Sequence, residues 1–125
     1  MSDRKTIIFA EDTVHIAKLL KFTLEKVGFN LIHFPSGIGV TEGVLKYKPD
    51  LVMLDIMMPV KDGLTVLKEL KSNPSTAHIP VILLTANSHE EYVVKGLQLG
   101  AIDYILKPFA SAELVLRIKN ILKMS

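Results

Sequence analysis

The sequence contains no cysteine and no tryptophan, and only 6% of its 125 residues are aromatic. The absence of cysteine excludes disulfide bonds and thiolate metal ligands. No apolar run approaches the roughly 18–20 residues that a helix needs to cross a bilayer. The first residues also lack the apolar segment of a signal peptide. We therefore expect a cytoplasmic protein that makes no membrane contact.

A strong charge of either sign is also missing, since 15 basic and 13 acidic residues leave a net charge of +2. This balance gives no reason to expect that the chain itself binds nucleic acid, and few aromatic rings are available to stack on bases. Hydrophobic residues make up 49% and charged residues 22%, as in ordinary globular proteins. We expect one domain that spans residues 1–125.

Short β-branched apolar runs alternate with amphipathic segments along the chain. The runs predict strands at Thr6–Ala10, Asn30–Phe34, Leu51–Leu54, Val81–Leu84 and Ala101–Leu106. The segments after them predict helices at about 13–27, 37–47, 63–70, 89–99 and 111–123. Five strand–helix repeats favour a parallel sheet with helices on both faces, and the more polar second run suits an edge. We predict an α/β, doubly wound (βα)5 fold of the flavodoxin-like class, with a five-stranded parallel sheet of order 2-1-3-4-5.

In the first helix, the spacing predicts a core stripe of Ile16, Leu20, Leu24 and Val27. In the last helix, it predicts a core stripe of Leu114, Ile118, Ile121 and Leu122.

Polar residues stand directly after the four most apolar runs. The residues are Glu11 and Asp12 after the first strand, Asp55 after the third, Thr85 after the fourth and Lys107 after the fifth. Ligands of doubly wound sheets bind outside the carboxyl ends of the strands. We therefore expect these five side chains to meet in one crevice.

Three carboxylates that share a crevice repel one another, and each pair at ~4 Å costs about 4 kcal/mol at an effective dielectric constant near 20. Mg²⁺ would offset this repulsion, since the ion binds carboxylate, water and phosphate oxygens. Lys107 adds a fixed positive charge and Thr85 a hydroxyl group, which together suit phosphoryl transfer to Asp55. Taken singly, these residues also have structural explanations, such as helix capping by Asp12. The spacing across four strands favours the joint site.

Four blocks of sequence carry a resemblance to a known family. They are the pair Glu11-Asp12, the block L-D-I-M-M-P-V-K-D-G from Leu54 to Gly63, L-T-A from Leu84 to Ala86, and G-A-I-D-Y-I-L-K-P-F from Gly100 to Phe109. In this order and at this spacing they resemble the response-regulator receiver family of two-component signalling. The resemblance extends from Lys5 to Lys123.

The resemblance implies a role for each residue of the crevice. It makes Asp55 the phosphoacceptor. The phosphoryl group would come from the phosphohistidine of a sensor histidine kinase or phosphotransfer protein. It assigns Mg²⁺ directly to Asp12, Asp55 and the backbone carbonyl of Met57, with Glu11 acting through water. Such a domain would catalyse only its own phosphorylation and dephosphorylation.

The resemblance also implies how the phosphorylated state is sensed. Thr85 and Lys107 would contact the phosphoryl oxygens, and Tyr104 would turn inward when Thr85 moves. The Lys107–Pro108 bond would be cis, as X-Pro bonds can be. Met57 and Asn87 would border the path of the hydrolytic water, and neither favours attack. We therefore expect a phosphoryl lifetime of minutes or longer.

Two surfaces are candidates for partners. Leu19, off the core stripe of the first helix, is a candidate kinase contact, although scattered surface apolarity would explain it equally well. The outward Leu116 would belong to the signalling face of the fourth helix, fifth strand and fifth helix. Asp103 and Arg117 match residues of a salt-bridged dimer of the transcription-factor subfamily and suggest a phosphorylation-dependent homodimer. Val93, where that subfamily usually has a basic residue, counts against it.

Two other classes fit less well. A haloacid-dehalogenase-type phosphatase would need a second Asp two residues after Asp55, where this chain has Met57. A flavin-binding module would need a Ser/Thr/Gly-rich phosphate loop after the first strand, where the chain has Glu11 and Asp12.

Overall fold

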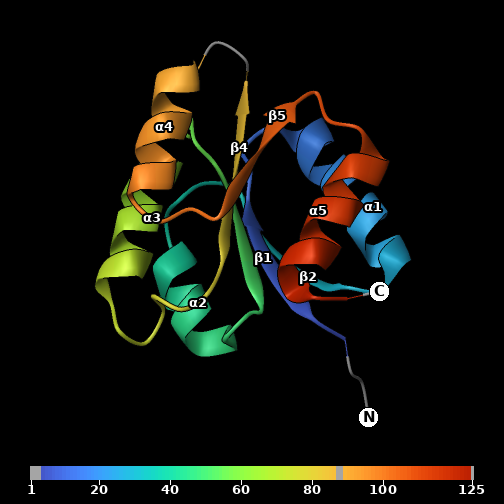
Figure 1. Ribbon diagram of the computed structural model, residues 1–125, viewed down its shortest axis with the longest axis horizontal. Helices are drawn as coiled ribbons and strands as arrows, with labels where there is room; N and C mark the ends of the chain where they lie inside the picture. Colours follow the sequence, from blue (N-terminus) through green and yellow to red (C-terminus); the bar gives the residue numbers. More distant parts are fainter. Residues whose placement is uncertain (1–3, 87–88, 125) are drawn as a thin grey trace.

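The computed structural model describes residues 4–86 and 89–124, and strands and helices alternate along these ranges (Figure 1). The strands are β1 (Thr6–Ala10), β2 (Asn30–Phe34), β3 (Leu51–Asp55), β4 (Val81–Ala86) and β5 (Asp103–Lys107). The helices are α1 (Val14–Val27), α2 (Val40–Tyr47), α3 (Gly63–Ser72), α4 (Glu90–Gln98) and α5 (Ser111–Leu122). Within these ranges, no helix combines the length and the apolarity required to traverse a bilayer.

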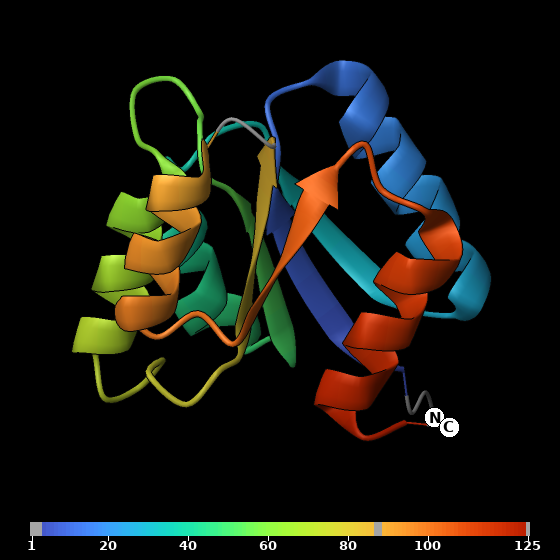
Figure 2. The same cartoon turned by 45° about the horizontal axis from the view of Figure 1, so that its top comes forward.

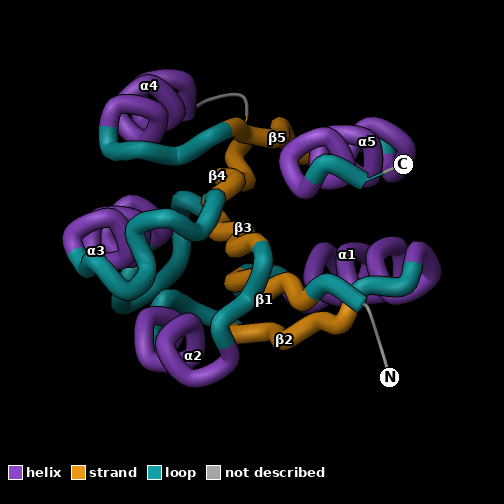
Figure 3. Tube along the Cα trace, turned by 60° about the horizontal axis from the view of Figure 1, so that its bottom comes forward, coloured by secondary structure: helices purple, strands orange, loops and turns teal. Residues whose placement is uncertain are grey.

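The strands form a parallel sheet of order β2-β1-β3-β4-β5. Seen along the strands, α2, α3 and α4 cover one face of the sheet, and α1 and α5 cover the other (Figure 3). The predicted fold and strand order are therefore confirmed. The more polar β2 lies at an edge, as its sequence indicated.

The core consists of two apolar layers, one on each face of the sheet. Alternate residues of β3 supply both: Val52 and Leu54 pack in the layer beneath α2, α3 and α4, whereas Leu51 and Met53 pack beneath α1 and α5. All four are fully buried. This two-sided burial explains why the central strands are continuous apolar runs rather than alternating ones.

The core stripe of α1 is largely as predicted, but the predicted burial of Val27 is wrong. Leu20 and Leu24 are fully buried, whereas Val27 is 38% exposed. The cause is Gly28, whose left-handed backbone ends the helix and donates its N–H to the last carbonyls. The chain then turns back, and Phe29 occupies the core position instead.

The start of α2 differs from the prediction by three residues, since the helix begins at Val40 and not at Gly37. Gly39 is left-handed, with φ of 83°, so the helix cannot extend back through it. Gly37 donates its N–H to the carbonyl of Lys61, at 3.1 Å, in the loop between β3 and α3. A Cβ at Gly37 would collide with that carbonyl. A contact distant in sequence therefore sets this boundary.

The fifth strand also begins later than predicted, at Asp103 instead of Ala101. The N–H of Ala101 donates to the carbonyl of Gly96 at 3.0 Å and so belongs to the end of α4. This hydrogen bond accounts for the shorter strand.

Candidate functional site

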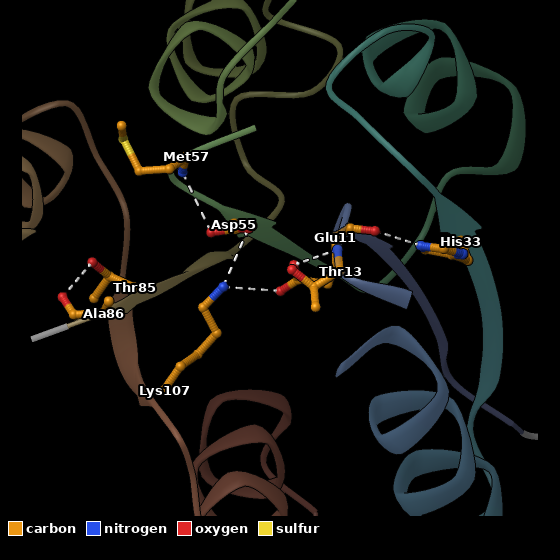
Figure 4. A network of polar contacts seen from close by, with 8 residues as sticks. All are labelled: Glu11, Thr13, His33, Asp55, Met57, Thr85, Ala86 and Lys107. Carbon is orange, nitrogen blue, oxygen red and sulfur yellow. Dashed lines mark hydrogen bonds and ion pairs between the residues drawn. The ribbon is translucent and has the colours of Figure 1, made fainter. Parts of the chain in front are cut away.

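The carboxyl ends of the central strands bring the side chain of Lys107 into contact with those of Glu11 and Asp55 (Figure 4). Ala10 of β1 is paired with Leu54 of β3, so the next residues, Glu11 and Asp55, emerge side by side. Lys107 Nζ lies 3.2 Å from Asp55 Oδ2 and 3.2 Å from Glu11 Oε1. One ammonium group therefore bridges the two buried carboxylates.

The site is buried at its base and open at its rim. Glu11 and Thr85 are each 1% exposed and Asp55 is 3% exposed, whereas Asp12 is exposed. The N–H of Thr13 donates to Glu11 Oε2 at 3.1 Å, and the N–H of Met57 donates to Asp55 Oδ1 at 3.3 Å. These contacts fix the orientation of both buried carboxylates.

Carboxylate oxygens of Glu11, Asp12 and Asp55 all lie within 4.8 Å of one another. Oxygen donors at this spacing are the ligands that a hard cation such as Mg²⁺ prefers. The donor set of the described residues therefore fits the cation predicted from the sequence.

Burial and, to a lesser extent, the neighbouring Glu11 carboxylate raise the pKa of Asp55 from 3.8 to about 7, against the opposing effect of Lys107. Without a cation, a large fraction of the Asp55 carboxyl therefore holds its proton near neutral pH. A positive charge placed beside it would favour the ionised form, which is the form that can act as a nucleophile.

Of the remaining predicted features, the structure describes Thr85, Tyr104 and the Lys107–Pro108 bond. Thr85 Oγ1 donates to the carbonyl of Ala86 at 3.1 Å, so its hydroxyl is directed along its own strand (Figure 4). Tyr104 is 37% exposed and borders a cavity of about 200 Å³ that Ala86 and Val93 also line. The Lys107–Pro108 bond is cis, as predicted. Asn87 lies outside the described residues.

Sequence reasoning missed one neighbour of the site, His33 on β2. Its Nε2 lies 2.9 Å from the backbone oxygen of Glu11, and its ring stacks on Phe9 with centroids 4.7 Å apart. The parallel register pairs His33 with Phe9. Residue spacing does not predict which residues of two strands are paired, so nothing in the sequence singled out this histidine.

Fold and site together define a doubly wound α/β protein with an acidic centre, a lysine and a threonine at the carboxyl ends of its strands. Residues 7–119 match the family model of the response regulator receiver domain. The chain belongs to this family and is the receiver domain of a two-component response regulator.

Three similar proteins illustrate the match. The transcriptional regulatory protein RprY of Bacteroides fragilis is 38% identical over 123 residues, which cover 98% of this chain and 51% of RprY. A putative response regulator from Chloroflexus aurantiacus is 32% identical with a TM-score of 0.92, over 97% of this chain and 99% of that one. The receiver domain of the sensor histidine kinase PA1611 from Pseudomonas aeruginosa, which has a magnesium ion coordinated in its active site cleft, is 26% identical with a TM-score of 0.89, over 96% and 98%.

The chain spans about half the length of the curated relatives that it matches.

Proposed function

We propose that Asp55 accepts a phosphoryl group from a phosphohistidine in a Mg²⁺-dependent reaction, and that the modified site alters the face formed by α4, β5 and α5. The observation that carries the proposal is the bridge from Lys107 to both Asp55 and Glu11. This bridge puts the ammonium group of Lys107 beside Asp55, the only carboxylate of the acidic cluster that is the last residue of a central strand.

Glu11, Asp12, Asp55 and the backbone carbonyl of Met57 would hold the Mg²⁺. The fit rests on the three carboxylates within 4.8 Å and on the magnesium ion in the cleft of the PA1611 receiver domain. When bound, Mg²⁺ would neutralise charge on the oxygens of the transferred phosphoryl group.

The residues of the chain itself would carry out the transfer. An Asp55 oxygen forms the new bond to phosphorus while the phosphorus–nitrogen bond breaks, and its electron pair remains on the donor imidazole. Lys107, already 3.2 Å from Asp55, is within reach of the phosphoryl oxygens and stabilises their charge. In this role the domain catalyses only its own phosphorylation and dephosphorylation.

Thr85 and Tyr104 would report the modification. The Thr85 hydroxyl, which donates to Ala86, would rotate toward a phosphoryl oxygen, because a charge-assisted hydrogen bond is stronger than a neutral one. The ring of Tyr104 would then enter the cavity beside Ala86 and Val93. This movement would carry the signal to α4 and β5.

The partners follow from the same proposal. A sensor histidine kinase or phosphotransfer protein would dock near the site, and Leu19 of α1 is exposed and available to it. We expect the domain to span residues 1–125, to act in the cytoplasm, and to contact neither nucleic acid nor a membrane itself.

Substitution of the acceptor tests the proposal. The purified chain is incubated with Mg²⁺ and acetyl phosphate, and acid-labile phosphate is measured by intact mass. We expect Asp55→Asn to abolish the modification. Asp50→Asn is a matched control, because Asp50 precedes the other end of β3 and accepts a hydrogen bond from Thr6 N–H. If Asp55→Asn is labelled to the same extent as the unsubstituted chain, Asp55 is not the acceptor.

A further inference from the structure

The loop between β3 and α3 contains a strained turn close to the acidic site. Figure 2 shows this loop in light green at the upper left, above the ends of α3 and α4. The N–H of Lys61 donates to the carbonyl of Pro59 at 2.7 Å, and the central residue, Val60, has φ of 68°. These features describe the rare and strained form of γ-turn. A β-branched residue is especially unsuited to a positive φ.

Val60 itself contributes nothing that would hold this conformation, since its side chain is 89% exposed. A strained conformation persists only where its surroundings impose it. On the N-terminal side of the turn, Met58 is buried in the core. On the C-terminal side, Lys61 makes contacts that constrain the turn.

Lys61 is held through both its backbone and its side chain. Its carbonyl accepts the N–H of Gly37 at 3.1 Å. Its Nζ lies 2.7 Å from Glu69 Oε1 on α3, and the same oxygen accepts a hydrogen bond from Thr41 Oγ1 on α2 at 2.6 Å. These hydrogen bonds also hold the pKa of Glu69 below its usual value. The loop is thereby tied to two helices at a single carboxylate oxygen.

The turn lies next to the segment that faces the site. Met57, whose N–H donates to Asp55 Oδ1, is separated from the turn only by Met58. The N–H of Gly63 closes the loop onto the carbonyl of Ile56 at 3.0 Å. A change in the turn would consequently move the Met57 backbone relative to the Asp55 carboxylate.

We propose that Lys61 and Glu69 are positioning residues for the cation site. Their ion pair, tied to α2 through Thr41, maintains the strained turn at Val60 and so keeps the Met57 segment in the conformation that binds Mg²⁺. This inference rests on the cation binding of the proposed function, and it adds residues that touch neither the cation nor the phosphoryl group.

Lys61→Met separates positioning from electrostatics, because only the loss of positioning weakens Mg²⁺ binding. Removal of a positive charge from the molecule does not disfavour cation binding by electrostatics, whereas loss of the anchor disfavours it. We expect Lys61→Met to weaken Mg²⁺ binding about tenfold, the lower end of the cost of removing a group that orients metal ligands. Lys68→Met is the matched control: Lys68 is exposed on the same helix as Glu69, and the variant should bind Mg²⁺ at least as tightly as the unsubstituted chain.

The experiment is a calorimetric Mg²⁺ titration of each variant, combined with hydrogen exchange of the Gly37 and Gly63 amides in the metal-free protein. We expect faster exchange at both amides in Lys61→Met, and partial recovery of affinity in Val60→Gly/Lys61→Met, since glycine adopts a positive φ without strain. Faster exchange with unchanged affinity, or no recovery in the double variant, overturns the inference. Unchanged exchange shows that the ion pair is not an anchor and also overturns it. If the unsubstituted chain itself binds no Mg²⁺, the proposed function fails, whatever the exchange data show.

Discussion

At the scale of single residues, the main tension in the molecule is electrostatic. Asp55 is buried beside Glu11 and has only Lys107 as an oppositely charged partner within 4 Å among the described residues. Burying a carboxylate disfavours its charged form, and one ammonium group shared between two carboxylates compensates only part of that cost. The metal-free site is therefore destabilised in the state that the proposed chemistry requires.

This tension predicts how stability depends on pH. The pKa of Asp55 is about 7 in the folded protein and near 3.8 when the chain is unfolded. Between these values the folded state binds more protons, so this residue makes the free energy of unfolding fall as pH rises, and the loss persists above pH 7. We expect Asp55→Asn to raise the melting temperature in metal-free buffer by several degrees at pH 8 and little at pH 4. Thermal unfolding across this pH range measures it, with Asp50→Asn as control. A difference that is equal at both pH values would contradict the shifted pKa.

A second prediction at this scale concerns the lifetime of the phosphoryl group. The Met57 side chain is half-exposed at the rim of the site and can neither orient nor activate a water molecule. The amide of Asn87, a residue outside the described ranges, is a poor general base. We expect Met57→Asn/Asn87→Glu to speed hydrolysis about tenfold, or ~1.4 kcal/mol in barrier height. Loss of label after removal of excess donor measures it. A half-life of seconds in the unsubstituted chain, or no acceleration, would mean that other groups control water access.

At the scale of elements, the strands were predictable because burial on both faces leaves a continuous apolar run such as Leu51–Leu54. The polar residues that follow these runs then predicted a candidate site. The start of α2 was not predictable, because it depends on the contact between Gly37 and Lys61. The direction of the Thr85 hydroxyl and the position of His33 were equally hidden, since they depend on a rotamer and on strand register.

The relation between β5 and α4 gives the next prediction. Tyr104 borders a cavity between these elements and does not belong to the acidic cluster of Glu11, Asp12 and Asp55. We expect Tyr104→Ala to leave phosphorylation of Asp55 largely intact, and to weaken phosphorylation-dependent partner binding. Tyr47→Ala, an exposed tyrosine on α2, is the control. Labelling rate and partner affinity are measured on the same samples. Equal loss of both would indicate unfolding of the region rather than a broken switch.

At the scale of the whole molecule, the face formed by α4, β5 and α5 has the character of a contact surface. The exposed apolar side chains of these elements and of the loop between α4 and β5 include Val94, Leu97, Ile102, Leu106 and Leu116, the last of which also borders a pocket beside Phe22 of α1. The ion pair of Asp103 and Arg117, which the sequence suggested for a dimer, forms within one chain at 2.9 Å. Val93 is buried in the core layer beneath α4, so a basic residue at its position would need a different environment. These findings make apolar contacts, rather than salt bridges, the expected basis of any self-association.

We therefore expect weak self-association that tightens when Asp55 carries beryllofluoride, a phosphoryl mimic, with Mg²⁺. Because burial of apolar surface is not screened by salt whereas exposed ion pairs are, the association should survive an increase in salt concentration. Leu116→Ser should weaken it, since Leu116 of α5 is 60% exposed. Leu45→Ser, an exposed leucine on α2, should not. Sedimentation velocity with and without beryllofluoride measures the association of all three proteins. A monomer in both states would indicate that this face binds a different protein. Dissociation by salt would indicate that ion pairs involving Asp103 and Arg117 hold the two copies together.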